Sequence, residues 1–247
     1  MRSGLGLSGR RESHVLHAFV CCCGLLLILG CKGSPPAGSA NSNGPATTIK
    51  LDGTVDKWLK KTPVWDNGPV PADISPRDIH IMKVFFDNDS HYFYAFIQCS
   101  PTVQDRYKVT QFSGAIGQLY FDADNNPETG GPSLMGDSNP KARGYKIKVY
   151  LPLGVFSGTS GGGAFASYEI YRFTGQNLDD NSGFNAKIPN SDQDDMHPNT
   201  LIADGKDGVE VAIPLEMLGM KPGAMARIMI QEATPDQPAG FTTYQCR

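Results

Sequence analysis

The chain has 247 residues, of which 40% are apolar and 19% charged, and its formal net charge is −3 at pH 7. Nucleic-acid-binding proteins present basic surfaces to the phosphate backbone, so this slightly acidic composition excludes nucleic acid as a partner. The length suits a single large all-β domain, and the apolar fraction is sufficient to form a substantial core.

The N-terminal 30 residues have the composition of a secretory signal. Arg2, Arg10 and Arg11 precede an apolar stretch over residues 15–30, which ends in a small residue. A basic region, a short apolar region and a small residue before the cleavage point are the parts of a signal peptide. An uncleaved transmembrane anchor is the alternative, but the stretch is shorter than the ~20 residues of a spanning helix. We therefore predict a signal peptide over residues 1–30.

The segment Ile28-Leu29-Gly30-Cys31 resembles the lipobox of bacterial lipoproteins. The resemblance implies that Cys31 is acylated, becomes the mature N-terminus and anchors the protein to a lipid membrane of the bacterial cell envelope. The next residue is Lys, which by proteobacterial sorting rules favours the outer membrane or the periplasmic face. Residues 31–47 then comprise the lipidated cysteine and a linker rich in Ser, Gly, Pro and Asn, a composition typical of a flexible tether.

Two cysteines remain beyond the predicted anchor, Cys99 and Cys246. An even pair of cysteines in an exported protein meets an oxidising environment, which favours a disulfide. A bridge between these two would tie the C-terminal tail to the end of a strand and close a long loop. The alternative is a pair of free thiols, one buried and one at the terminus, because the sequence gives no geometry for the bridge.

From Ile49 onward the apolar residues alternate with polar ones far more often than they recur at helical spacing. Short runs rich in aromatic and β-branched residues are separated by Gly, Pro, Asn and Asp, as in sandwiches and barrels. Helical pattern is limited to turns over 55–60 and 214–219, and 174–207 is expected to be a long loop region with a small hairpin. The sequence predicts an all-β fold, a two-sheet antiparallel β-sandwich over residues 48–247 with long loops and one or two short helical turns. The expected strands are 79–86, 91–98, 117–122, 144–151, 166–173, 208–213, 226–232 and 242–246.

Four segments, taken together, resemble one family of β-sandwich domains. In their order and spacing they are similar to the family 9 carbohydrate-binding modules and the wider DOMON-like domains. The resemblance implies a jelly-roll or DOMON-like sandwich, carbohydrate as the partner and calcium as a structural cofactor. The segments are 49–58 (IKLDGTVDKW), 119–130 (LYFDADNNPETG), 144–150 (GYKIKVY) and 208–219 (GVEVAIPLEMLG).

Family members that bind glucan ends clamp the sugar between two tryptophans, and an aromatic ring suits the apolar face of a pyranose. The resemblance therefore makes Trp58 and Trp65 candidate sugar-binding residues. A structural alternative for Trp58 is packing of a short helix against the sheet, whereas the polar, Pro-rich stretch around Trp65 suits an exposed ring. No tryptophan follows Trp65. The other wall of a sugar site is then expected from Tyr107, Phe112, Phe165, Tyr168 or Phe184.

Asp122, Asp124, Asn126 and Glu128 present side-chain oxygens at alternate positions of one loop. Calcium takes six to eight oxygen ligands, and a glycine-containing loop wraps carboxylates around the ion. Pro127 stands where an EF-hand loop requires glycine, so this is not an EF-hand. The pattern predicts a loop calcium site of another kind. The alternative is an acidic β-turn whose side chains bond their own backbone.

The sequence has few features of an enzyme: it contains no nucleophile elbow, no zinc-binding histidine motif and no distinguished pair of carboxylates for glycoside hydrolysis. We therefore expect non-catalytic binding of polysaccharide by a membrane-anchored lipoprotein, as an accessory to glycoside hydrolases. Two alternatives stay open. One is a structural or protein-interaction lipoprotein of the cell envelope. The other is a haem-binding DOMON-like redox domain, with His80 and Met82 of one predicted strand as its candidate ligands.

Overall fold

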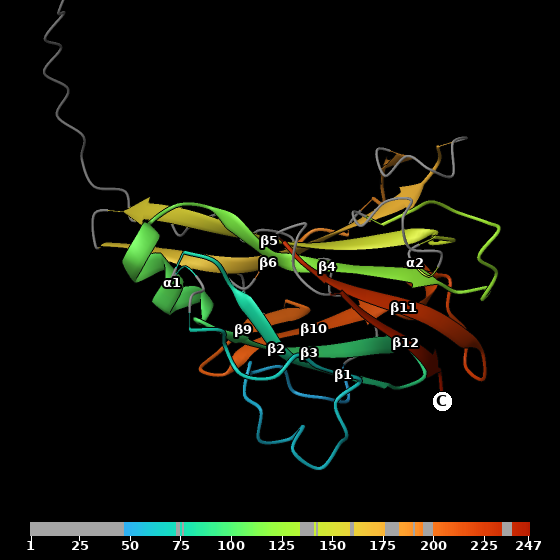
Figure 1. Ribbon diagram of the computed structural model, residues 1–247, viewed down its shortest axis with the longest axis horizontal. Helices are drawn as coiled ribbons and strands as arrows, with labels where there is room; N and C mark the ends of the chain where they lie inside the picture. The colour runs from blue at the N-terminus through green and yellow to red at the C-terminus, as the bar shows by residue number, and fades with distance from the viewer. Residues whose placement is uncertain are drawn as a thin grey trace, which may run out of the picture. The chain divides into compact units, whose positions relative to one another are not determined.

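The computed structural model describes residues 47–72, 75, 77–133, 141, 143–158, 161–175, 183–189, 191–194, 200–233 and 239–247. The described residues form two antiparallel sheets that pack face to face (Figure 1). The predicted two-sheet β-sandwich is therefore confirmed. In this part of the chain no helix is long and apolar enough to cross a membrane.

The predicted signal peptide, the lipidation of Cys31 and nearly all of the predicted linker lie outside the described residues. They stay predictions of the sequence. Close to the start of the described residues, Thr48 donates its backbone N–H to the hydroxyl of Tyr94 at 3.0 Å.

The smaller sheet has five strands in the order β1–β2–β3–β10–β9. Strands β2 and β3 form the predicted hairpin, in which Asn88 pairs with Phe93. Strand β10 leads directly into helix α2 (Leu215–Leu218), which ends at Gly219 with φ 68°, in the left-handed region that favours glycine. The strands are β1 (Trp65–Asp66), β2 (His80–Asn88), β3 (Tyr92–Ser100), β9 (Ile202–Asp204) and β10 (Gly208–Pro214).

The larger sheet has seven strands, six of them in the order β12–β11–β4–β5–β6–β7, while β8 pairs with β6. Strands β5 and β6 are longer than the sequence predicts, because they remain paired as far as Gly158 and Gly161, whereas β4 pairs with β5 only up to Leu153. The two strands therefore continue beyond β4 as a two-stranded ribbon. The strands are β4 (Gly114–Asp122), β5 (Ile147–Gly158), β6 (Gly161–Phe173), β7 (Phe184–Lys187), β8 (Gln193–Asp194), β11 (Met225–Glu232) and β12 (Ala239–Gln245).

Two parts of the fold differ from the sequence prediction. Helix α1 (Val103–Thr110) was not expected; it is capped by Thr102, whose hydroxyl accepts the backbone N–H of Asp105 at 3.2 Å. The helix ends at Gln111, which has φ 54°. The region 174–207, expected to be a long loop with a small hairpin, contributes the short strands β7, β8 and β9.

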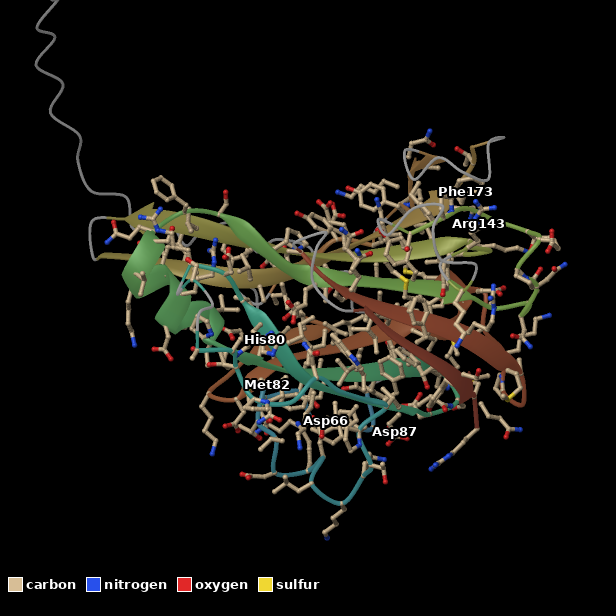
Figure 2. All side chains as sticks on the ribbon, in the orientation of Figure 1. Asp66, His80, Met82, Asp87, Arg143 and Phe173 are labelled. Carbon is tan, nitrogen blue, oxygen red and sulfur yellow. The ribbon has the colours of Figure 1, made fainter. Side chains whose placement is uncertain are left out.

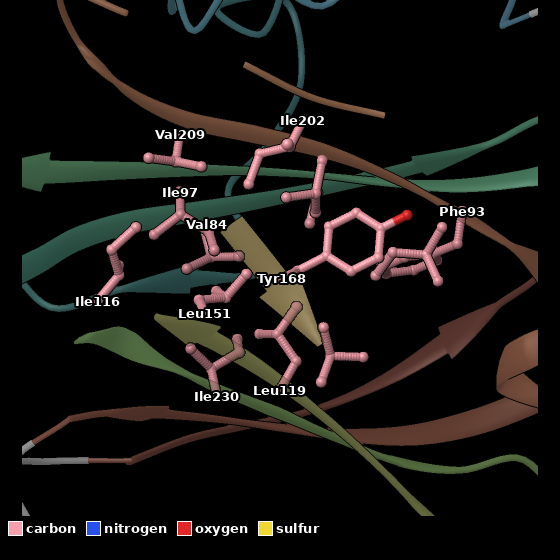
Figure 3. Close-up of a cluster of buried hydrophobic side chains, with 14 of the residues drawn as sticks. Val84, Phe93, Ile97, Ile116, Leu119, Leu151, Tyr168, Ile202, Val209 and Ile230 are labelled. Atoms are coloured by element: carbon pink, nitrogen blue, oxygen red, sulfur yellow. The ribbon is translucent and has the colours of Figure 1, made fainter. Parts of the chain in front are cut away.

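Alternation along the strands builds the core between the two sheets. Val84, Phe93 and Ile97 of the smaller sheet pack in one cluster with Leu119 and Ile230 of the larger sheet (Figure 3). Successive side chains of a strand point to opposite faces, so every second residue of these strands lies in the core. Full burial of a Val, Leu, Ile or Phe side chain contributes about 1.5–3 kcal/mol.

Each sheet also buries side chains on its outer face. On the smaller sheet, the segment that precedes β1 places Trp58 against Phe85, Tyr94 and Phe96. This explains why β3 is buried along most of its length on both faces. On the larger sheet, the outer cluster consists of Tyr120, Tyr145, Phe184 and Met229.

The predicted disulfide is not formed, because Cys99 and Cys246 are both free, buried thiols. Cys99 pairs with Ile81 at the start of β2. Cys246 precedes Arg247, whose N–H donates to Asn88 at the end of β2 at 3.0 Å. At ~3.3 Å per residue these ends of β2 lie roughly 20 Å apart, far beyond the Cα separation that a disulfide allows.

Candidate functional site

The first and last of the four family-like segments meet at the wholly buried carboxylate of Glu210 in β10. The backbone N–H groups of Asp52 and Gly53 donate to Glu210 Oε2 at 2.9 and 3.3 Å. Trp58 Nε1–H donates to Oε1 at 3.0 Å. Lys57 Nζ forms an ion pair with Oε2 at 2.9 Å. This set, the Glu210 clasp, fixes the N-terminal segment on the smaller sheet.

Two of the predicted sugar-binding residues lie inside the protein. The ring of Trp58 is 0% exposed and stacks on Phe96 with the ring centroids 6.0 Å apart. The structural alternative therefore accounts for Trp58. Tyr168 is buried in the core, where its hydroxyl donates to the carbonyl of Ala212 in the opposite sheet at 3.1 Å. Neither ring offers a face to a ligand.

The other predicted sugar-binding residues do not form one site. Trp65 in edge strand β1 is half-buried, with its ring against Gly240 of β12. Tyr107 in α1 is also half-buried and directs its hydroxyl towards Gly162 of β6. Phe112 directly follows α1 and is 71% exposed. The structure thus gathers Tyr107 and Phe112 at the α1 end of the sandwich and leaves Trp65 at its edge.

The second family-like segment contributes the buried carboxylate of Asp122 to an ion pair. Nε and Nη2 of Arg227 in β11 each lie 2.6 Å from Asp122 Oδ2. The backbone N–H of Asn126 donates to Asp122 Oδ1 at 3.3 Å. Arg227 also donates to the carbonyl of Arg143 at 2.9 Å and lies over the ring of Tyr145. The ion pair therefore joins β4, β11 and the start of the third segment, near Arg143 in Figure 2.

Asp124 lies in the same loop, where it forms an ion pair with Lys146 and accepts a hydrogen bond from the Thr129 hydroxyl at 3.2 Å. The hydrogen bond with Asp122 is the main cause that lowers the pKa of Asp124, and Lys146 and Thr129 lower it further. Burial is the main cause that raises the pKa of Asp122, and the bond to Asp124 adds to the rise. Asp124 is therefore the more strongly ionised of the two.

The four residues of the predicted calcium loop do not converge on one point. The carboxylates of Asp122 and Asp124 are turned to the two cations just described. Asn126 Oδ1 accepts the backbone N–H of Glu128 at 3.0 Å, as in an acidic turn. Among the described residues, no group of three or more His, Cys, Asp or Glu side chains could hold a metal ion. The residues as placed do not fit calcium, whose binding stays a prediction of the sequence.

A hollow of about 380 Å³ opens beside this loop. Its walls come from the end of β4, the start of β5, the end of β6 and helix α2, which lie together at one end of the sandwich (Figure 1). Phe173 and Met217 form part of its apolar wall. A concave site with apolar walls and a few polar groups is the default hypothesis for ligand binding. The charged residues that line it are Asp124, Lys146, Arg172 and Glu216.

The backbone around the hollow is held by close contacts. Gly130 has φ 95°, and a Cβ at this position would lie 2.3 Å from the carbonyl oxygen of Tyr145. The N–H of the neighbouring Gly131 donates to that carbonyl at 2.7 Å. On the α2 wall, the N–H of Gly219 donates to the carbonyl of Glu216 at 3.2 Å. Both walls are therefore preorganised by backbone contacts.

The charges in the hollow are of two kinds. Asp124 and Lys146 neutralise each other. Arg172 and Glu216 are exposed, and within the described chain neither has an ion-pair partner. Sequence reasoning identified Asp124 but treated Glu216 as an ordinary residue of a helical turn and did not single out Arg172. No spacing signal marks this set, because its members come from four segments that only the fold brings together.

His80, a candidate haem ligand, is bound to other protein groups. Its Nδ1 lies 3.0 Å from Oε1 of Glu232 in β11, and Asn67 Nδ2 lies 3.4 Å from both His80 Nε2 and Glu232 Oε1. Burial lowers the pKa of His80 and raises the pKa of Glu232 to about 7. Met82 occupies a bulge of β2, and Figure 2 labels it close to His80.

The described part of the chain is thus a two-sheet antiparallel β-rich domain with a charged hollow at one end. No protein-family model, no curated protein and no solved structure matches the chain. The resemblance to family 9 carbohydrate-binding modules and DOMON-like domains therefore stays a prediction from the four segments.

Proposed function

We propose that the chain binds carbohydrate without catalysis, and that the hollow beside α2 holds a short segment of a polysaccharide. The observation that carries the proposal is the placement of Glu216 and Arg172, which have no ion-pair partner among the described residues, with Phe173 in one concave site. At about 380 Å³ the hollow lies near the lower end of the range for ligand pockets, roughly 300–1,000 Å³. This size favours a small unit of a longer chain.

The side chains suit a polyhydroxylated ligand. A carboxylate such as Glu216 accepts hydrogen bonds from sugar hydroxyls, and a guanidinium such as Arg172 donates to their oxygens. Phe173 and Met217 provide apolar contact for the C–H face of a ring. The carboxylate and the guanidinium together balance in charge, which favours a neutral sugar over a strongly charged ligand.

The charges of the hollow favour binding over hydrolysis. Glycoside hydrolysis needs two carboxyl groups, one of which stays protonated to act as the general acid. Asp124 has a lowered pKa and is paired with Lys146, so it is a poor proton donor. This leaves Glu216 as the remaining acidic group of the hollow. We therefore assign the hollow to recognition, and the predicted lipoprotein signal places that recognition at the cell envelope, as an accessory to glycoside hydrolases.

The proposal is tested by a screen of the full chain against neutral and acidic polysaccharides, followed by calorimetry on any that bind. Arg172→Ala and Glu216→Gln are expected to weaken binding at least about tenfold, since each removes a charge-assisted hydrogen bond. Arg77→Ala is the matched control, because Arg77 is an exposed arginine outside the hollow. If both hollow variants still bind but Trp65→Ala or Phe112→Ala does not, the sugar site lies at Trp65 or Phe112 and not in the hollow. Failure to bind any polysaccharide would refute the function.

A further inference from the structure

The end of the sandwich opposite the hollow carries an exposed apolar surface. There β5 and β6 continue past Leu153, the last residue of β5 that pairs with β4. We define residues 154–158 and 161–165 as the β5–β6 ribbon. Helix α1 packs against one side of it, since a Cβ at Gly162 would lie 2.2 Å from the hydroxyl of Tyr107 (Figure 1).

Phenylalanine rings cover the other side of the ribbon. The ring of Phe156 lies across Gly163, where a Cβ would come within 2.7 Å of it, and the ring of Phe165 lies across Gly154 in the same way at 1.9 Å. Phe156 is nevertheless 46% exposed. Phe112, at the adjoining end of α1, is more exposed still. Val109 and Val155 add two further exposed apolar side chains at this end.

The same end is depleted of charge. No acidic or basic residue and no histidine occurs between 151 and 167, although 19% of the chain is charged. In α1, Lys108 pairs with Asp105 at 2.8 Å. Arg106 donates to backbone carbonyls, that of Phe112 at 2.9 Å among them, and no described carboxylate pairs with it. The ribbon is therefore uncharged, and Arg106 lies behind it without an ion-pair partner among the described residues.

We infer that the β5–β6 ribbon and Phe112 dock on a lipid bilayer, with the phenylalanine rings in the interfacial region. Aromatic and aliphatic side chains gain free energy on entering that region, and an uncharged ribbon enters it without desolvating a charge. Arg106 lies where it complements anionic headgroups. This charge pattern distinguishes the tip from the rest of a chain whose net charge is −3.

The length of chain before the sandwich is compatible with a lipid bilayer as the partner of the ribbon. Residues 32–47, between the predicted lipidated Cys31 and Thr48, span at most roughly 55 Å when extended. Thr48 bonds Asp89 at the hollow end of the sandwich, and the roughly 55 Å reach exceeds the roughly 40 Å length of the long strands, so a bilayer that holds the anchor lies within reach of the tip. Stable attachment commonly requires a second signal beside an acyl anchor. The inference does not rest on the proposed sugar site, which lies at the other end.

The test measures partition of the full chain onto vesicles of phosphatidylcholine, with and without phosphatidylglycerol, in a Cys31→Ser background that prevents acylation. The double variant Phe112→Ser/Phe156→Ser is compared with Leu59→Ser, which removes a 68% exposed leucine from the N-terminal segment. All proteins keep residues 1–30, so the contribution of that apolar stretch is common to them. We expect about a tenfold loss of partition for each phenylalanine removed and no loss for Leu59→Ser. Unchanged thermal unfolding shows that the variants remain folded.

A second readout locates the contact. Vesicles are expected to shift the emission of Phe156→Trp to the blue relative to its parent, and brominated acyl chains are expected to quench it, whereas Leu59→Trp responds to neither. Equal partition of the double variant and the Leu59→Ser control would overturn the inference. So would concentration-dependent dimerisation that the double variant abolishes, since the occupant would then be a second copy. The inference would also be overturned if a soluble polysaccharide, and not vesicles, shifted the emission of Phe156→Trp to the blue.

Discussion

The two ends of the sandwich are built from the same long strands but differ in chemistry. Where β5 begins and β6 ends, Lys146 and Arg172 line a hollow that also holds carboxylates, and the ion pair of Arg227 with the buried Asp122 lies beside it. At the other end the same two strands carry no charge, and phenylalanine rings lie over glycines. Each strand spans roughly 40 Å at ~3.3 Å per residue. One hairpin therefore separates the polar hollow, which we propose for recognition, from the apolar ribbon, which we propose for docking.

The difference shows how stability and function are distributed. The hollow end depends on buried electrostatic contacts, so single substitutions there are expected to destabilise the fold. The ribbon end contributes exposed apolar area, so its substitutions are expected to change association and leave folding nearly unaffected. A buried carboxyl group lies towards each end, Asp122 beside Arg227 and Glu232 beside His80, and the two differ in their partners.

The largest effect is expected at the hollow end for Arg227→Ala. The variant leaves the wholly buried Asp122 without its cation, and breaking a buried pair in this way costs about 3–5 kcal/mol of unfolding free energy. Urea denaturation at pH 7 measures the loss. Arg172→Ala, an exposed arginine of the same hollow, is the control and is expected to change stability by less than about 0.5 kcal/mol. A loss below about 1 kcal/mol for Arg227→Ala would contradict the role assigned to the ion pair.

The second effect concerns pH at the ribbon end. Burial raises the pKa of Glu232 from 4.5 to about 7, so its contribution to stability is complete below pH 4.5 and is lost as the pH rises through 7. We expect the wild-type unfolding free energy to fall by about 2–3 kcal/mol between pH 4.5 and 8 from this group. Glu232→Gln is expected to lack that decrease.

His80 contributes with the opposite sign, because burial lowers its pKa below 6.5. Its contribution is present above pH 6.5 and is lost as the pH falls through the lowered pKa. Urea unfolding between pH 6.5 and 8 therefore isolates Glu232. Equal slopes for wild type and Glu232→Gln in this window would contradict the assignment.

A smaller effect is expected midway between the ends. Tyr168→Phe removes the hydrogen bond that joins the two sheets at Ala212, and the loss of one such bond costs about 1 kcal/mol. Hydrogen exchange is expected to accelerate equally in strands near both ends, since the bond lies in the shared core. Tyr150→Phe, which alters a half-exposed residue, is the control. A change confined to one end would show that the ends unfold separately.

The smallest effect is expected for calcium. Asp122 and Asp124 are engaged by Arg227 and Lys146, so millimolar calcium is expected to shift the thermal midpoint by less than about 1 °C. Differential scanning calorimetry with and without a chelator measures the shift. A larger rise that Asp124→Ala abolishes would support the calcium site that the sequence predicts.

The sequence predicted the strands well because alternation of apolar residues reports burial directly, as in the hairpin of β2 and β3. Helix α1 was missed although its capping signal, Thr102 with Asp105 three residues later, is present. Val103 is the buried residue of that helix, so the helix lacks the apolar stripe that reveals helices in a sequence. Apolar periodicity thus identified the strands, whose buried side chains recur at regular spacing, and missed a helix that has no such pattern.

The candidate site was harder to predict because its interacting residues lie far apart in the sequence. Trp58 is buried because its indole N–H meets Glu210, a residue that no local pattern connects to it. Arg172 and Glu216 reach one hollow only through the packing of β6 and α2. Asp124 was identified because its neighbours carry oxygen-rich side chains, but its partner Lys146 was not. Partners that are distant in sequence decide whether a polar residue binds a ligand or supports the fold.

The Glu210 clasp also has a mechanical consequence. A pull on the N-terminal tether reaches the folded domain first at Thr48 and then at Asp52 and Gly53, which are bonded to Glu210. Glu210 belongs to β10, which is held by β3 on one side and β9 on the other. Force applied through the predicted tether is therefore expected to enter the smaller sheet through β3 and β10, each of which has neighbours on both sides, so the domain is expected to resist peeling.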